Sequence, residues 1–282
     1  MRIPGAAGVD VRRPSGPPGL YYDPQFLTRA ERSEVTRWLS KLRPIWEKRF
    51  SKHHPAPEGV ANRPLLRPVY WLGNWQFACL GYYHPPRKTQ NRCVAAEPFP
   101  PALAVLVRRV EKIVHRQFPP SYIPRGWHLN TCLVNLYGGR IQDGKMVDNA
   151  RVGEHKDAEP GPVASISIGE RALFQFVASR GKGHASQVVM QQWLDDCSLQ
   201  IFAGPQFKDR LFHRVQRVDK KAGHRFVFPV DGFETRRVNF TFRYVPPKDI
   251  VPFSKLPKEH AEDVQEYVEA LAENSPFWRG AL

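Results

Sequence analysis

The feature that most constrains the fold of this chain is a series of short apolar runs that begins after residue 127. Each run is only a few residues long, polar or turn residues separate the runs, and no long helical stretch intervenes. They cover residues 130–137, 163–168, 172–177, 187–193, 198–203, 224–228 and 237–245. Short strands without intervening helices pack as an antiparallel sandwich or a jelly roll, so we predict that architecture here.

Helical patterns precede this strand-rich part. A first helix is predicted over residues 28–50, where Thr28 and Glu31 form a capping box and Pro44 should end or kink the helix. A second helix is predicted over residues 100–118, because its apolar residues recur on one helical face. Together with the strands, these helices predict an α+β fold.

Three residues of metal-binding type are spread along the strand-rich part. His155 and Asp157 form an H-x-D pair, and His213 follows far downstream. Two imidazoles and one carboxylate are the ligands of the facial triad that holds non-haem Fe(II) and leaves coordination positions open. Neither the pair nor the lone histidine is specific by itself. From the residues alone, Glu159 is a rival for Asp157, and His224 is a rival for His213.

A strand-like run near the end of this part alternates polar and apolar residues. The polar ones are Arg237, Asn239, Thr241 and Arg243, and they alternate with Val238, Phe240 and Phe242. Alternate residues of a strand share a face, so one face carries two guanidiniums, an amide and a hydroxyl. Arginines are the counter-charges that a dicarboxylate needs. A half-buried strand whose polar face is in solvent would have the same pattern.

Upstream, residues 133–139 have the pattern of a strand that runs into a turn, and they contain an N-x-Y motif. With this motif, the chain resembles the AlkB family of Fe(II)/2-oxoglutarate-dependent dioxygenases, because N-x-Y, H-x-D, H and R-x-N-x-T-x-R follow one another in that family's order. The resemblance covers about residues 60–246, is strongest over 131–244, and is closest to the nucleic-acid demethylases. It implies a double-stranded β-helix (jelly-roll) core and the use of Fe(II), 2-oxoglutarate and O2.

The resemblance implies that His155, Asp157 and His213 hold Fe(II). His213 is preferred to His224 because it precedes the arginine strand at the family's usual spacing. The chain departs from the family's pattern in a polar, glycine-containing insertion at about residues 140–151 and in an unusual Phe-Lys-Asp-Arg segment before His213. Neither departure removes a ligand.

A second set of residues is implied to bind 2-oxoglutarate: Asn135, Tyr137, Arg237, Asn239 and Arg243. Asn135 and Tyr137 would hydrogen-bond the cosubstrate, and Arg237 would pair with its distal carboxylate. Arg243 would lie near the metal-proximal carboxylate and the triad aspartate. Asn239 would brace this cluster from behind, a role that commonly matters as much as direct ligation.

An aromatic and basic segment at residues 69–88 precedes the strand-rich part. An enzyme that acts on a nucleobase flips it out or takes it from a single strand, and then stacks it on aromatic rings. By resemblance this segment is a nucleotide-recognition lid in which Trp75, Tyr82 and Tyr83 are candidates to contact a base. Glu159 is a further candidate for substrate binding. The alternative for each aromatic residue is a place in the core.

The chain is strongly basic, with a formal net charge of +15 and an isoelectric point near 9.9. Neutralisation of phosphates drives nucleic-acid binding, so we expect a polyanionic partner; charge that only aids solubility is the alternative. The basic residues form three groups, of which the last surrounds His213. The groups are Arg29, Arg32, Arg37, Lys41, Arg43, Lys48, Arg49 and Lys52; Arg87, Lys88 and Arg92; and Lys208, Arg210, Arg214, Arg217, Lys220 and Lys221.

The cysteine pattern bears on the compartment. The four cysteines show neither C-x-x-C pairs nor zinc-like spacing, which is typical of reduced thiols inside a cell. No apolar run is long enough to span a membrane, and the first residues lack the pattern of a secretory signal. We expect an intracellular protein, cytoplasmic or nuclear in a eukaryote, that acts as a monomer without a membrane partner.

These patterns divide the chain into four parts. We expect a flexible Pro/Gly-rich tail at residues 1–19, N-terminal helices and the lid at 20–126, the jelly-roll dioxygenase core at 127–250, and a C-terminal helical extension at 251–282. Within the last part, residues 257–274 have the apolar pattern of a helix.

The function implied by the resemblance is the oxidative demethylation of N-alkylated bases in DNA or RNA. In this reaction 2-oxoglutarate is converted to succinate and CO2, the alkyl group is hydroxylated, and the product collapses to formaldehyde and the repaired base. A 2-oxoglutarate-dependent hydroxylase of a protein or a small molecule is the alternative with the same chemistry. A catalytically silent binding module is a third possibility, although such a module would be expected to have lost at least one ligand.

Overall fold

A large antiparallel sheet forms the centre of the molecule. In the computed structural model, residues 17–82, 93–142, 144–148, 150–178, 186–216, 226, 230 and 232–282 are described. The strands of the large sheet lie in the order β1-β11-β8-β13-β5-β2, and β6 pairs with β5 beyond this path. Their bounds are β1 Leu20–Asp23, β2 Val69–Leu72, β5 Thr131–Gln142, β6 Lys145–Asp148, β8 Val163–Gly169, β11 Ser198–Phe202 and β13 Phe233–Arg243.

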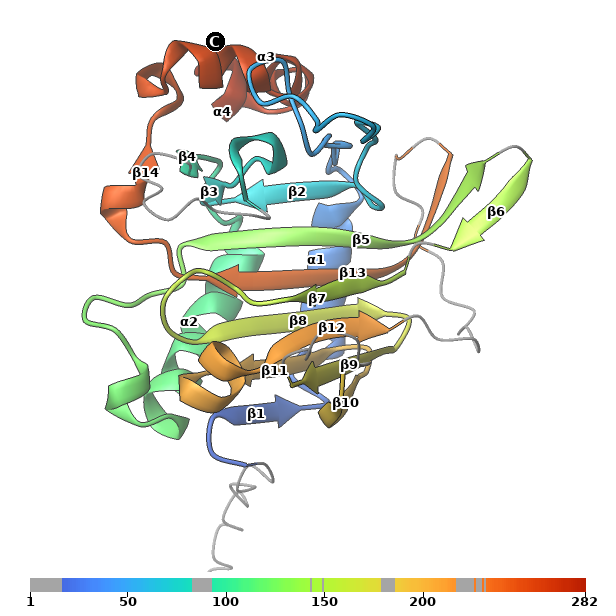
Figure 1. Ribbon diagram of the computed structural model, residues 1–282. Helices are drawn as coiled ribbons and strands as arrows, with labels where there is room; N and C mark the ends of the chain where they lie inside the picture. The colour runs from blue at the N-terminus through green and yellow to red at the C-terminus, as the bar shows by residue number, and fades with distance from the viewer. Residues whose placement is uncertain are drawn as a thin grey trace, which may run out of the picture.

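A smaller antiparallel sheet faces one side of the large one (Figure 1). Its strands lie in the order β10-β9-β12-β7, with bounds β7 Val152–His155, β9 Ala172–Val177, β10 Val188–Leu194 and β12 Phe212–Gln216. Apolar side chains fill the space between the two sheets at one end, among them Phe174, Phe176 and Phe202. The two facing sheets are the predicted jelly roll, which the structure confirms.

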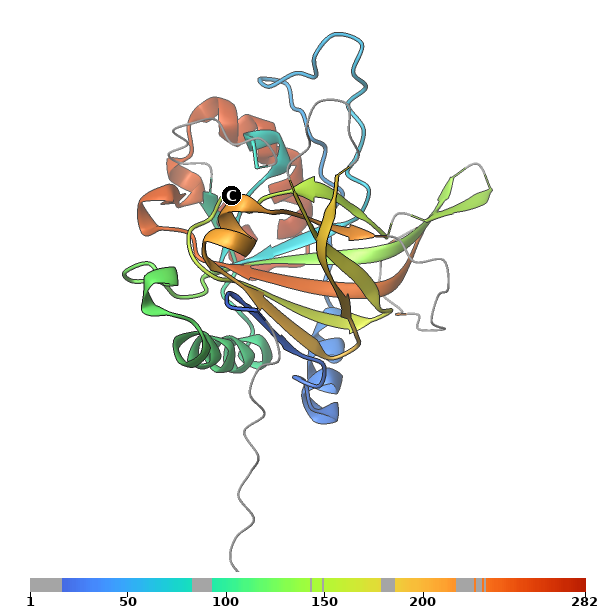
Figure 2. The same ribbon diagram turned by 60° about the horizontal axis from the view of Figure 1, so that its bottom comes forward.

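Two helices cover the other side of the large sheet (Figure 2). They are α1 Arg29–Leu39 and α2 Pro101–Gln117, and the main hydrophobic core lies between them and the sheet. The Trp38 ring, for example, lies 6.5 Å from that of Phe240. The sheet side facing these helices is therefore fully covered, which leaves the other side to form a site.

The first helix differs from its prediction in length. Its capping box is present, because Thr28 accepts from the Glu31 amide and the Glu31 side chain accepts from Thr28. The helix ends at Leu39 rather than near residue 50, well before Pro44. The residues that follow pair in part with β2 and with the chain before it, as in the bridges of Ile45 with Val69 and of Lys48 with Pro64. Tertiary pairing thus overrides local helical preference here.

The second predicted helix is confirmed. The apolar face of α2 is buried, and Pro101 occupies the first turn, where its missing amide proton costs nothing. A third predicted helix is confirmed as α3 Lys258–Ala272, followed by α4 Pro276–Arg279. These two helices pack over a corner of the molecule that holds β3 Asn74–Trp75, which pairs with β4 Cys93–Ala95, which in turn pairs with β14 Ile250–Val251. At this corner the rings of Trp75 and Trp278 lie 5.9 Å apart.

The strand predictions were incomplete. β7 and β12 were not predicted, because they are short and carry polar side chains on their cavity face. The insertion at residues 140–151 is in large part the β5–β6 hairpin, which projects from the sheet (Figure 1). Of the predicted run 224–228, only Phe226 is described, and it bridges to Thr235. None of the described helices is both long and apolar enough to cross a membrane.

Candidate active site

A cavity of about 420 Å³ lies between the two sheets. The large sheet contributes its polar face, and the small sheet contributes the residues around the end of β7 and the start of β12. All four polar residues of the arginine strand line it, whereas Val238, Phe240 and Phe242 point into the core. The polar face of β13 thus lines this cavity, and Arg237, Asn239 and Arg243 on it are buried.

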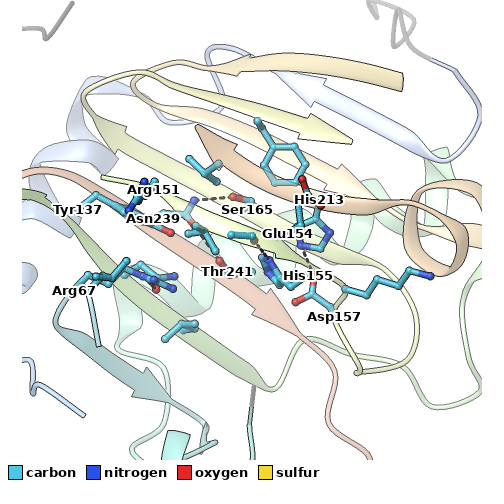
Figure 3. A pocket seen from close by; sticks show the side chains of 18 of the residues that line it. Arg67, Tyr137, Arg151, Glu154, His155, Asp157, Ser165, His213, Asn239 and Thr241 are labelled. Atoms are coloured by element: carbon cyan, nitrogen blue, oxygen red, sulfur yellow. Dashed lines mark hydrogen bonds and ion pairs between the residues drawn. The ribbon is translucent and has the colours of Figure 1, made fainter. Parts of the chain in front are cut away.

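The metal-type residues meet at one end of this cavity (Figure 3). His213 on β12 is the cross-strand partner of His155 on β7, and their rings lie 4.2 Å apart. Asp157 follows β7, and its Oδ2 lies 3.4 Å from Nε2 of His213. The three side chains each offer a ligand atom, and these atoms all lie within 4.8 Å of one another, close enough to hold one metal ion. Of the two rivals, Glu159 is not part of this cluster, and His224 lies outside the described residues.

The charge states at this end suit a cation. Burial by itself would raise the pKa of Asp157, but Arg243 and the two imidazoles lower it well below its ordinary value, so the carboxylate is ionised. Burial and the neighbouring His155 lower the pKa of His213 to about 3, so its imidazole is neutral. Metal binding requires these states. Oδ2 of Asp157 also has no hydrogen-bond donor among the described residues, which leaves it available to a metal.

Arg243 holds the triad carboxylate in place. Its Nε and Nη2 atoms both lie 2.7 Å from Oδ1 of Asp157, and its Nε lies 3.6 Å from Oε2 of Glu159. Although burial would lower the pKa of Arg243, its acidic neighbours raise it above its ordinary value. At the metal end of the cavity, the positive charge of Arg243 is therefore neutralised by the protein's own carboxylates, Asp157 and Glu159.

Lys208 belongs to the site, but the sequence analysis named it only as one member of a basic group and assigned it no role. It lies in a single π-helical turn, Pro205–Arg210, just before β12, and its buried Nζ donates to the backbone carbonyl of Asp157. Lys156 makes the reciprocal contact, with its Nζ 2.6 Å from the carbonyl oxygen of Asp209. The unusual segment before His213 was a signal of this feature. The two lysines tie the turn to the loop that carries the triad aspartate.

Arg237 lies against the ring of Tyr137, which Figure 3 shows at the other end of the cavity. It is almost fully buried, its Nη2 donates to Oγ of Ser167 at 2.9 Å, and its guanidinium lies 4.8 Å from the centre of the Tyr137 ring. Its Nε and Nη1 have no hydrogen-bond partner among the described residues. Burial lowers the pKa of Arg237, and the hydroxyl of Tyr137 opposes this shift. Unsatisfied buried donors on a cation fit an anionic ligand.

Arg67 joins this end and was missed by sequence reasoning. It is buried, lines the cavity, and donates from Nε to Oδ1 of Asn135 at 2.6 Å. Its guanidinium also lies 5.3 Å from the centre of the Tyr137 ring. No local motif marks this arginine, because it reaches the site only through the pairing of β2 with β5.

Asn239 lies between the two ends and is engaged by the protein. Its Nδ2 donates to Oγ of Ser165 at 2.7 Å and to the carbonyl of Ile166 at 3.1 Å, and its Oδ1 accepts from Thr241 at 2.8 Å. Because its amide nitrogen binds β8 and its amide oxygen binds Thr241 on its own strand, Asn239 fixes the polar face of the sheet.

The structure separates the substrate-binding candidates. Tyr82 and Glu159 line the cavity, and Glu159 accepts from Nε2 of Gln76 at 2.8 Å. Trp75 is fully buried in the core, where its indole donates to Glu47 at 2.8 Å, so a base cannot reach it in this arrangement. The interpretation of Trp75 as a substrate contact is therefore wrong, and the alternative of a core aromatic holds. Tyr83 lies outside the described residues.

The donor set, the cavity and the fold agree with one class of enzyme. Residues 19–243, most of the chain, match the sequence profile of the 2OG-Fe(II) oxygenase superfamily. The chain belongs to this superfamily and is a dioxygenase that uses Fe(II), 2-oxoglutarate and O2. The sequence matches none of the curated proteins.

Three solved structures are similar to the chain. OsALKBH1 is 17% identical, with 81% of this chain and 99% of that chain covered and a TM-score of 0.48. YcfD, a ribosomal oxygenase from Escherichia coli solved with cobalt and succinic acid, is 10% identical, with coverages of 92% and 62% and a TM-score of 0.31. A bsmA homologue from Methylobium petroleophilum is 13% identical, with coverages of 88% and 100% and a TM-score of 0.35. Similarity at this level says nothing about the substrate.

Proposed function

We propose that the protein removes alkyl groups oxidatively from N-alkylated bases of DNA or RNA. The observation that carries this proposal is the cavity itself, which joins a facial triad at one end to an arginine with unsatisfied donors at the other. The motif order that resembles nucleic-acid demethylases supports the substrate class. So does the net charge of +15, because phosphate neutralisation favours a polyanionic partner.

The assignment of ligands follows from the donor types. His155, Asp157 and His213 would hold Fe(II), since two neutral imidazoles and one carboxylate are its facial ligands. Arg237 would take the distal carboxylate of 2-oxoglutarate, because its Nε and Nη1 have no hydrogen-bond partner among the described residues and a guanidinium forms charge-assisted hydrogen bonds with carboxylates. When bound, the metal and cosubstrate supply the oxidising power for hydroxylation of a C–H bond.

Other side chains hold these groups. Arg243 fixes the carboxylate of Asp157, and Lys208 fixes its backbone. Tyr137 lies opposite Arg237 and Asn135 opposite Asn239; both line the cavity and would bind the cosubstrate along its length, while Asn239 keeps the strand face rigid. The protein's contribution is thus to bind the reactants in the cavity and to orient them there.

Two residues near the metal end would receive the base. The Tyr82 ring lies 6.0 Å from the Arg243 guanidinium and lines the cavity, so it offers a stacking surface. One oxygen of Glu159, Oε2, has no hydrogen-bond donor among the described residues, which suits it to accept from an exocyclic amine. In this proposal residues 127–250 form the catalytic core, residues 20–126 support it and carry Tyr82, and residues 251–282 are a helical extension.

The test is to load the protein anaerobically with Fe(II) and 2-oxoglutarate and then admit air in the presence of methylated single-stranded DNA or RNA oligonucleotides. Succinate and the bases would be measured by mass spectrometry, with unmethylated oligonucleotides as controls. We expect succinate together with loss of the methyl group. Binding of the same oligonucleotides should weaken as salt is raised.

A second candidate keeps the chemistry and changes the substrate to a protein side chain or a small molecule. The observation that favours it is the burial of Trp75, which leaves Tyr82 as the one candidate aromatic shown at the cavity by the described residues. Succinate formation without any change in the oligonucleotides would support this candidate and contradict the nucleic-acid proposal.

A further inference from the structure

Arg67 enters the cavity because of strand register. β2 pairs antiparallel with β5, with Val69 opposite Asn135, so a residue two positions before Val69 lies opposite Tyr137. The backbone continues this pairing, since the amide of Leu136 donates to the carbonyl of Pro68. A side chain from outside the family's motifs is thereby brought to the cosubstrate end of the cavity (Figure 3).

The contact with Arg67 decides which way the Asn135 amide faces. A guanidinium has only donors, so the group that it meets at 2.6 Å must be the amide oxygen. The amide nitrogen is then the remaining polar group of this side chain. It is a donor, and a ligand carboxylate offers acceptors.

Arg67 also adds charge where Arg237 already lies. Both guanidiniums are within cation–π distance of the Tyr137 ring, at 5.3 and 4.8 Å from its centre. Each is nearly buried, and each lines the same cavity. Two cations that share one ring in a buried place repel one another, and this repulsion is relieved when an anion binds between or beside them.

We propose that Arg67 is a positioning residue for the dicarboxylate cosubstrate. It orients Asn135 to donate, and it strengthens the positive field at the Arg237 end, so that a 2-oxo acid with a distal carboxylate is preferred to one without. This inference rests on the cosubstrate site proposed above. It also makes cosubstrate binding depend on the chain before β2, which no motif of the core contains.

The test compares Arg67→Met, Arg67→Lys and Arg237→Met with Arg171→Met. Arg171 matches them in charge, but it lies at the β8–β9 turn, half-exposed, with its guanidinium 4.0 Å from the centre of the Trp193 ring. Affinity for 2-oxoglutarate and for 2-oxobutyrate, which lacks the distal carboxylate, would be measured by calorimetry on the Mn(II)-loaded proteins. The KM for 2-oxoglutarate and kcat would be taken from succinate release.

We expect Arg67→Met to bind 2-oxoglutarate about tenfold more weakly, the loss of one charge-assisted contact, with kcat and Mn(II) affinity much less changed. Its preference for 2-oxoglutarate over 2-oxobutyrate should fall by a similar factor. Arg67→Lys should recover part of the preference, because it restores the charge without the rigid fork. A purely structural role would instead weaken both 2-oxo acids equally.

The outcomes separate the two proposals. If Arg67→Met and Arg67→Lys keep the wild-type preference while Arg237→Met loses it, the role of Arg67 is refuted and the cosubstrate site stands. If Arg237→Met also binds 2-oxoglutarate like wild type, the proposed cosubstrate site is itself wrong. Thermal unfolding of each variant shows whether it is folded. If Arg67→Met is not folded, the test depends on Arg67→Lys alone. Binding of 2-oxoglutarate by Arg67→Lys as tight as that of the wild type would then refute the need for the guanidinium of Arg67.

Discussion

Arg236 and Arg237 are neighbours on β13, yet their side chains lie in opposite kinds of environment. Arg236 points away from the cavity and pairs with Glu170 at 3.1 Å and with Asp148 at 2.9 Å, with Glu234 at 4.0 Å. Arg237 points into the cavity, makes one hydrogen bond to Ser167, and leaves two of its nitrogens without partners among the described residues. Both are nearly inaccessible to solvent.

A β-bulge creates this difference. The pairing of β13 with β5 shifts between Thr235 and Arg237, so Arg236 is the extra residue and its neighbour returns to the cavity face. The lesson is that burial of an arginine does not by itself indicate a site. A buried cation that the protein neutralises contributes structure, and one that the protein leaves partly unsatisfied prepares a place for an anion.

The largest effect on activity is expected when a metal ligand in the cavity wall is replaced. His155→Ala removes one triad ligand, so 2-oxoglutarate-dependent succinate formation should be abolished, while thermal stability changes little because this side chain is only partly buried. His128→Ala, at an exposed histidine, is the matched control. Full activity of His155→Ala would refute the triad.

On the face of β13 that is turned away from the cavity, the substitution Arg236→Met should lower the stability of the fold. It removes the cation that both buried carboxylates, Glu170 and Asp148, contact, so the free energy of unfolding should fall by about 3–5 kcal/mol in urea titrations. The KM for 2-oxoglutarate should stay near the wild-type value in the folded protein. If that KM rises as much as in Arg237→Met, the contrast between the two arginines does not hold.

Glu47 is a third buried ionisable side chain to compare with Arg236 and Arg237, and its hydrogen-bond partners are neutral. Burial raises its pKa from 4.5 to about 7, although the amide of Ala78 and the indole of Trp75 donate to it. Because the folded state holds this proton more tightly, its contribution to stability is complete below pH 4.5 and is lost as the pH rises to about 7.

The expected loss across this window is about 3 kcal/mol, which urea titrations at several pH values would measure. Glu47→Gln should flatten this part of the pH dependence, whereas Glu58→Gln, at an exposed glutamate, should leave it unchanged. Equal pH slopes in wild type and Glu47→Gln would show that this carboxyl group does not titrate there.

The smallest effect concerns the support of the triad. Lys208→Met removes the donor to the carbonyl of Asp157, and such a loss behind a ligand commonly costs about 10–100-fold in metal affinity. Titration with Co(II) against a competing chelator would measure it. Lys156→Met, which removes the exposed reciprocal contact, should have the weaker effect. Identical affinities in both variants would mean that burial of the contact is unimportant.

Some features of the fold could be predicted because they depend on neighbours in the chain. The capping box of α1 and the apolar face of α2 are local patterns of this kind. The end of α1 at Leu39, the hairpin at the insertion and the short strands β7 and β12 were missed. Each of these depends on pairing with distant residues, and a few residues of polar strand carry no periodicity to detect.

By itself the sequence determined the superfamily, the ligand types and the shared face of the arginine strand, since residue chemistry and the period of a strand belong to the chain. The tertiary structure decided which buried residues reach the cavity. It placed Trp75 in the core, brought Arg67 to Asn135 across 68 positions, and set Lys208 behind Asp157. These outcomes required the register of β2 on β5 and the turn before β12, because contacts between distant residues form only when their elements pack.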